Sequence, residues 1–123
     1  MLPFSVVTLG DVLLVSIQEE IDDTGISALF DTIVAKAGIR DVHGVILDLH
    51  KVEVVDSYLA RHLQELAAGL KLMQTKVVVA GLCVPVVMTL LDFEIDLKGI
   101  TFALDVEQAM AQLGTGVDTQ MDA

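Results

Sequence analysis

One serine in the chain stands where a phosphoryl group could be added without disturbing a fold. Ser57 follows Asp56 after the apolar run 45–49 and a short loop, and it falls where a helical pattern begins. At the carboxyl end of a parallel strand, a hydroxyl lies where such sheets expose functional groups. At a helix N-terminus, unpaired N–H groups and the helix dipole tolerate negative charge. The simpler alternative is that Asp56 or Ser57 only caps the helix.

The other residues that could do chemistry form no known catalytic or metal-binding pattern. His43 and His50 flank one predicted strand, seven residues apart, and neither they nor His62 belong to an HExxH motif. CxxC, GxGxxG and GxxxxGK[ST] motifs are also missing from the sequence. We therefore expect solvated surface histidines, with no catalytic residue, no metal and no cofactor. Cys83 lies in an apolar stretch without a basic neighbour to activate its thiol, so we expect a buried small hydrophobe.

Alternating strand and helix patterns must position this serine. Runs rich in Val, Leu and Ile predict five strands, over residues 3–9, 12–18, 44–49, 76–81 and 100–104. Apolar residues at helical spacing predict four helices, over 22–38, 59–73, 85–92 and 105–113. The two-residue turn at Gly10 suits a hairpin, which adds an antiparallel strand at an edge or beside the centre. The order predicts an α/β fold with a mostly parallel, mixed sheet.

The composition narrows the class of protein. The 123 residues suit one domain over 1–113, followed by an acidic tail over 114–123 that we expect to be disordered. Val, Leu and Ile together supply 44 residues, and so much aliphatic surface excludes a disordered chain. Only 7 Lys and Arg oppose 18 Asp and Glu, which gives a net charge of −11. This balance argues against nucleic-acid partners and against anionic membranes, because both require basic surface.

Location and local charge follow from the same sequence. The single cysteine cannot form an internal disulfide, and the N-terminus has no signal-peptide pattern. The longest uncharged run, 77–91, has 15 residues and is too short to span a bilayer comfortably, so we interpret it as a strand, a turn and a helix. We expect a cytoplasmic protein. Residues 32–91 hold five acids and six bases, so Ser57 lies in a nearly neutral region between two acidic ones.

The whole pattern resembles the STAS domain, the fold of anti-sigma factor antagonists, over about residues 3–113. The resemblance rests on the opening hairpin, on the segment from 45–49 to 55–57, and on the later strand 77–81. It implies that Ser57, the serine after the loop aspartate, is phosphorylated by a partner Ser/Thr kinase. Classical antagonists continue Asp-Ser-[Ser/Thr]-Gly-Leu-Gly, whereas residues 56–61 here read Asp-Ser-Tyr-Leu-Ala-Arg, without glycine.

That continuation, together with residues 72–73 and 81–90, resembles the stressosome branch of the family, and the length suits its single-domain, RsbS-type scaffold. The resemblance implies a non-enzymatic scaffold in bacterial stress signalling that assembles with itself and with RsbR-type sensor paralogues. The complex would hold an RsbT-type Ser/Thr switch kinase and release it when Ser57 is phosphorylated, and a phosphatase would reverse the modification. The candidates for contact with the kinase or a neighbouring subunit are Asp56, Tyr58, Arg61 and His62.

Three alternatives stay open at the level of sequence. Arg61 and Glu65 could form only a weak surface pair at i,i+4 spacing. The same serine could serve a direct antagonist that binds an anti-sigma kinase without a large complex. A phosphoaspartate receiver fits the length, the acidity and the strand-end Asp48, but two strands precede the first helix and the last strand is not followed by the expected lysine.

Overall fold

The computed structural model describes residues 3–18, 21–39, 42–53, 55–93 and 100–114, and they form five strands and four helices. The strands are β1 (Phe4–Leu9), β2 (Val12–Ile17), β3 (Gly44–Asp48), β4 (Lys76–Ala80) and β5 (Thr101–Ala103). The helices are α1 (Asp23–Ile39), α2 (Ser57–Leu72), α3 (Val84–Asp92) and α4 (Val106–Leu113). Their order along the chain confirms the predicted α/β pattern.

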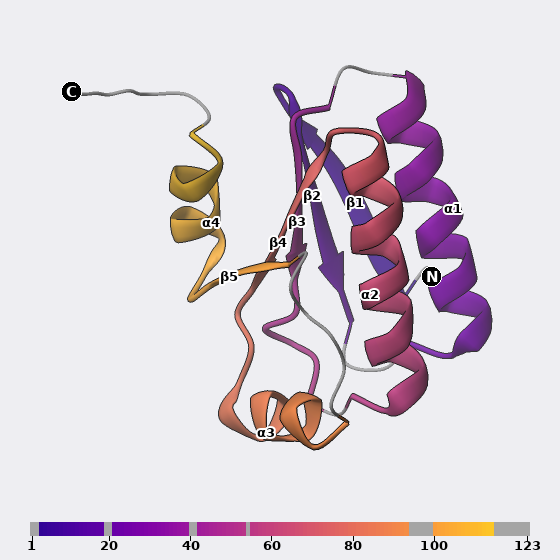
Figure 1. The fold of residues 1–123 in the computed structure, drawn as a ribbon, viewed down its shortest axis with the longest axis vertical. Coiled ribbons are helices and arrows are strands. Elements are labelled where there is room, and N and C mark those ends of the chain that lie inside the picture. Colours follow the sequence, from indigo (N-terminus) through magenta and orange to yellow (C-terminus); the bar gives the residue numbers. More distant parts are fainter. Residues whose placement is uncertain (1–2, 19–20, 40–41, 54, 94–99, 115–123) are drawn as a thin grey trace.

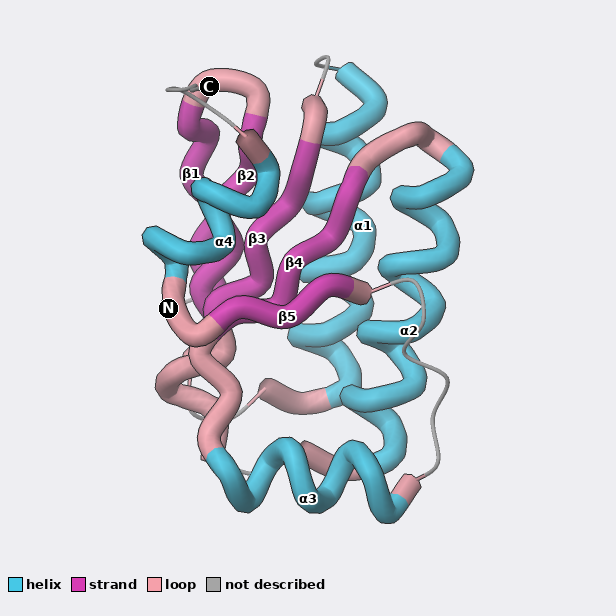
Figure 2. Tube along the Cα trace, turned by 60° about the vertical axis from the view of Figure 1, so that its left-hand side comes forward, coloured by secondary structure: helices cyan, strands magenta, loops and turns pink. Residues whose placement is uncertain are grey.

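The five strands form one mixed sheet in which every strand lies beside its neighbour in sequence, in the order β1-β2-β3-β4-β5 (Figure 2). β1 pairs with β2 antiparallel, and Leu9 lies opposite Val12 across the predicted turn. Gly10 takes φ 61 in that turn, which a glycine adopts without strain. The remaining pairs are parallel. The opening hairpin therefore places its antiparallel strand at an edge of the sheet.

Helices cover both faces of the sheet, and α1 and α2 lie on the opposite side from α4 (Figure 1). Val45 and Leu47 of β3 point into the larger core, whereas Ile46 between them points into a smaller core under α4. A strand buried on both faces has no polar alternation, which explains why β3 and β4 read as continuous apolar runs. Gly44 lets α4 approach closely, because a Cβ there would lie 2.7 Å from Leu113 Cδ2.

The third helix closes the carboxyl end of the sheet, below the strands in Figure 1. Pro85 stands in its first turn, where the missing N–H has no intrahelical role. Val86 and Leu90 are buried in the larger core, so α3 contributes one narrow apolar stripe and exposes the rest. The interpretation of 77–91 as a strand, a turn and a helix is confirmed.

The topology also decides between fold classes. Receiver domains are doubly wound, with strand order 2-1-3-4-5. The observed order and the antiparallel β1–β2 pair differ from that pattern, so the receiver alternative is wrong.

The last strand is shorter than the predicted 100–104, and the tail predicted for 114–123 lies outside the described residues after Gly114. In the described ranges, no helix combines the length and apolarity that crossing a membrane requires.

Candidate functional site

Asp56 caps the second helix, and this leaves the neighbouring serine uncommitted. Asp56 has extended backbone angles (φ −95, ψ 174), and its Oδ1 accepts a hydrogen bond of 2.8 Å from the N–H of Leu59. Its carbonyl accepts a further bond of 3.1 Å from the N–H of Ala60. The capping alternative is thus correct for Asp56. It does not compete with modification of Ser57, which is the first helical residue.

Ser57 is accessible from solvent. Its side chain is exposed, and within the described part of the chain its hydroxyl makes no hydrogen bond. Leu59 and Ala60, two and three residues further along α2, are buried in the core, so the helix beneath the serine is firmly packed. A phosphate at this position would meet the positive end of the helix dipole, which stabilises an anion.

The loop before the serine is anchored by buried valines. Val52 and Val55 are 2% and 3% exposed, and both belong to the larger core. The N–H of Val52 donates to the carbonyl of Leu49 over 2.9 Å, and the N–H of Leu49 donates to the carbonyl of Ala80 over 2.9 Å. The loop therefore continues the β3–β4 pairing before it turns. These contacts fix the position of Asp56 and Ser57 relative to the sheet.

A strand-end carboxylate holds the start of the same loop. Asp48 Oδ1 accepts hydrogen bonds from His50 Nδ1 (2.8 Å) and from the His50 backbone N–H (3.1 Å). Gly81 lies against this turn with φ 80, and a Cβ there would approach His50 Cβ to 2.9 Å. The sequence interpretation missed this cluster. The sequence does contain a signal for it: Asp48 stands two residues before His50. This is the spacing of an Asx-turn, in which an aspartate side chain accepts from the backbone two residues on.

Two of the predicted contact residues form one aromatic pair. The rings of Tyr58 and His62 lie with centroids 4.1 Å apart at 31°. His62 Nδ1 also lies 2.9 Å from the Tyr58 carbonyl, to which it can donate. The pair thus presents a polar aromatic surface one residue from Ser57. Partner binding by these side chains stays a prediction.

Arg61 lies one helical turn from Ser57, on the same face of α2, because the two residues stand at i,i+4. Its side chain is exposed. Among the described residues Arg61 forms no ion pair with Glu65, so the surface-pair alternative is wrong. The guanidinium is therefore available to a phosphate on Ser57 or to a partner.

The histidines and the cysteine differ from expectation. His43 is partly buried, and its Nε2 lies 3.0 Å from the Leu113 carbonyl, so the prediction of a solvated histidine is wrong there. The described residues contain no group of three or more side chains that could hold a metal. Cys83 is exposed, and the prediction of a buried thiol is wrong. The reason is local: Cys83 is the N-cap residue of α3, and the residues that this helix turns into the core are Val86 and Leu90.

Replacing Asp56 with alanine should destabilise the protein by about 1 kcal/mol, because the N–H of Leu59 loses its acceptor. Asp56→Asn should retain most of the stability, since asparagine is an equally good cap. Asp105 caps α4 in the same way, accepting from the Gln108 N–H over 2.8 Å, so Asp105→Ala is a matched control. Urea unfolding measures all three. Equal stability of Asp56→Ala and the wild type would contradict the assignment.

Comparison with known proteins places this arrangement in a family context. The profile of the STAS domain matches residues 3–109. A serine-to-glutamate variant of RsbS from Moorella thermoacetica is similar in structure (TM-score 0.80, 24% identity, 89% of this chain and 92% of that chain). So is a stressosome chain, described as part of a signal integration and transduction hub (0.78, 25%, 89% and 95%). The anti-sigma factor antagonist SpoIIAA, in its unphosphorylated form, shares the fold (0.71, 10%, 93% and 99%). No curated protein matches the chain.

Proposed function

Because this chain belongs to the STAS domain family, we propose that it is a non-enzymatic phospho-switch scaffold of stress signalling. It assembles with sensor STAS paralogues of the RsbR type into a stressosome-like complex in the cytoplasm. The complex holds an RsbT-type Ser/Thr kinase, and phosphorylation of Ser57 by that kinase releases it. A phosphatase resets the scaffold.

The observation that carries this proposal is the division of roles between Asp56 and Ser57. Asp56 supplies the helix cap, while the Ser57 hydroxyl is exposed and unbonded within the described chain. A kinase needs an accessible hydroxyl, and a switch needs a fold that survives the modification. Both conditions are met at the same helix terminus.

The charges around Ser57 support the proposal that phosphorylation changes the charge of the surface that a partner meets. Residues 49–65 carry two basic and three acidic side chains. A phosphate adds about −1.5 to −2 charges, which is more than the net charge that these side chains carry together. Since Arg61 lies one turn away on the same face, it is the side chain we assign to pair with the phosphate. In the unmodified protein, Arg61 and the Tyr58–His62 pair are the proposed kinase contacts.

The similar structures agree with a switch at a serine. The RsbS structure carries an acidic residue in place of a serine, and SpoIIAA is described in an unphosphorylated form. The stressosome chain covers 89% of the present chain at 25% identity, which supports a role in an assembly. These likenesses favour the regulatory class over an enzyme.

Size-exclusion chromatography of the chain mixed with a sensor paralogue and the switch kinase tests the assembly. We expect all three proteins to elute together as a large complex without ATP. On addition of ATP the kinase should move to a later, low-mass fraction. If the kinase never co-elutes with the complex, the scaffold proposal is wrong.

A direct antagonist of an anti-sigma factor is the second candidate, favoured by the shared fold with SpoIIAA. It would use the same serine without a large particle. The same chromatography separates the two, because an antagonist would bind an anti-sigma kinase and would not co-elute with sensor paralogues. The missing glycines after Ser57, in the segment 58–61, favour the scaffold.

A further inference from the structure

Among the residues that the structure describes, the last strand of the sheet has one edge that no other strand covers. β5 pairs with β4 on one side only, and the Gly81 N–H donates to the Ala103 carbonyl over 3.2 Å. Successive residues of a strand direct their backbone groups to opposite sides. Phe102 and Leu104 therefore direct their backbone groups outward, where an added strand would pair with them.

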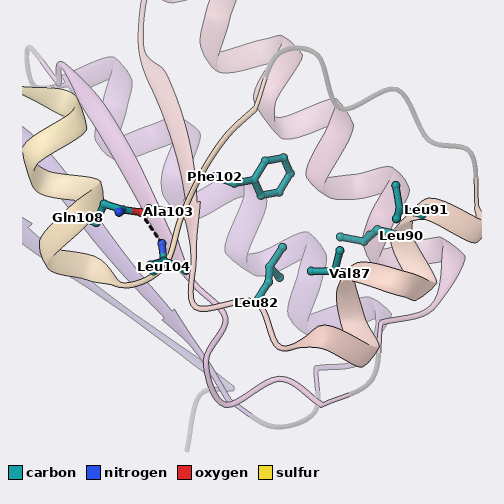
Figure 3. Close-up of a pocket in the computed structure, with 8 residues that line it drawn as sticks. All are labelled: Leu82, Val87, Leu90, Leu91, Phe102, Ala103, Leu104 and Gln108. Atoms are coloured by element: carbon teal, nitrogen blue, oxygen red, sulfur yellow. Dashed lines mark hydrogen bonds between the residues drawn. The ribbon is translucent and has the colours of Figure 1, made fainter.

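Two glutamine side chains of α4 occupy these outward groups. Gln108 Oε1 accepts from the Leu104 N–H over 2.7 Å (dashed in Figure 3), and Gln112 Nε2 donates to the Phe102 carbonyl over 3.1 Å. A glutamine amide offers the same donor and acceptor as a peptide group. The two side chains thus replace the backbone of a neighbouring strand.

The spacing of the glutamines matches the spacing of the strand. Four residues of helix rise about 6 Å, and two residues of a strand span about 6.6 Å. Because the chain reverses at Asp105, α4 runs back along β5, and the nearer glutamine meets Leu104 while the farther one meets Phe102. Both glutamines are exposed, so burial does not explain why they are held there.

The edge would otherwise attract another strand. Residues 100–104 are uncharged, and the side chains of Phe102 and Leu104 are 40% and 80% exposed. Beside them lies an open groove of about 390 Å³, which also takes in Leu82 and the α3 residues Val87 and Leu91 (Figure 3). An uncovered edge next to apolar surface is a known site of strand addition.

We propose that Gln108 and Gln112 close the β5 edge against pairing with β5 of a second copy of this chain. β5 is the occupant that fits, because antiparallel self-pairing would bring the exposed Phe102 and Leu104 of each copy to the groove of the other. The net charge of −11 opposes this contact, so salt that screens the charge should favour it. The inference is independent of the phospho-switch, since it concerns the isolated chain.

The test is the double variant Q108A/Q112A. Alanine suits exposed helix positions, so α4 should persist, which circular dichroism verifies. Hydrogen exchange of the Leu104 amide should become about tenfold faster or more, because its acceptor is gone. Gln108→Glu keeps an acceptor oxygen and should keep the protection. Unchanged exchange in the double variant would overturn the proposal.

Sedimentation velocity tests whether the partner at the β5 edge is a second copy of the chain. It is measured at about 0.5 M salt, where charges are screened over a few ångström. The double variant should sediment faster as its concentration rises, relative to the wild type and to Glu107→Ala, an exposed α4 control. Adding Phe102→Lys to the double variant should abolish the difference, since a charge at an edge blocks pairing. No concentration dependence in the double variant, or dependence that survives Phe102→Lys, overturns the second-copy assignment.

Discussion

Replacing Ser57 with alanine is expected to reduce phosphate transfer from the switch kinase to the level of a control without kinase. Ser57 presents an exposed hydroxyl at the first position of α2, and alanine removes only that hydroxyl. Stability should change by less than about 0.5 kcal/mol, because Asp56 and not Ser57 caps the helix. Mass spectrometry after incubation with kinase and ATP measures the transfer. The kinase should then stay in the complex in the presence of ATP.

Two further variants make this result specific. Ser27 is an exposed serine on α1, and Ser27→Ala should accept phosphate as the wild type does. Ser57→Glu adds one negative charge where phosphate adds about −1.5 to −2, so it should release the kinase in part. We expect a tenfold loss of kinase affinity, equivalent to about 1.4 kcal/mol. Phosphate on another residue of the Ser57→Ala variant would refute the assignment.

Gly81→Ala should destabilise the protein by about 2–5 kcal/mol. Its φ of 80 costs an alanine about 1–2 kcal/mol. The new Cβ would also lie 2.9 Å from His50 Cβ and 3.1 Å from the His50 backbone nitrogen, and such overpacking costs about 1–3 kcal/mol. Because a domain is stable by only about 5–15 kcal/mol, this is a large fraction. Urea unfolding measures the loss.

Substitutions at two other glycines separate the backbone cost of Gly81→Ala from the cost of its contact with His50. Gly10 has φ 61 and open space around it, so Gly10→Ala should show the backbone cost alone, about 1–2 kcal/mol. Gly69 lies inside α2 with nothing within 4 Å of a new Cβ, and Gly69→Ala should stabilise the protein by about 0.5–1 kcal/mol. If Gly81→Ala loses no more stability than Gly10→Ala, the contact with His50 carries no cost.

The architecture was largely predictable from local patterns. The hairpin around Gly10, the buried runs of β3 and β4, and the apolar stripe of α2 each identify an element within a few residues of the chain. The place of Ser57 at the start of α2 follows from the same patterns, because strand, loop and helix stand in sequence there. The edge position of β1 did not follow, since pairing order depends on contacts between distant segments.

The details of the site depend on side chains that bind distant backbone, and sequence spacing does not report these. The contact of Gly81 with the turn at His50 joins two strand ends that are neighbours only in the folded sheet. His43 finds its partner at Leu113, seventy residues away. Arg61 and Glu65 have the spacing of a pair and still form none, because exposed long side chains gain little by pairing. Cys83 lies between strand and helix as the pattern predicted, but its apolar neighbours do not bury it, because only Val86 and Leu90 of α3 turn into the core.

The sequential order of the strands has a consequence for synthesis. Each new strand pairs with the one made just before it, so the sheet can grow as the chain leaves the ribosome, without waiting for distant segments. The exception is the β5 edge, whose glutamines follow it in the chain, the second one nine residues after Ala103. At about 5–20 residues per second, translation takes on the order of a second to supply them. Until then the Leu104 N–H and the Phe102 carbonyl lack the glutamine side chains that pair with them.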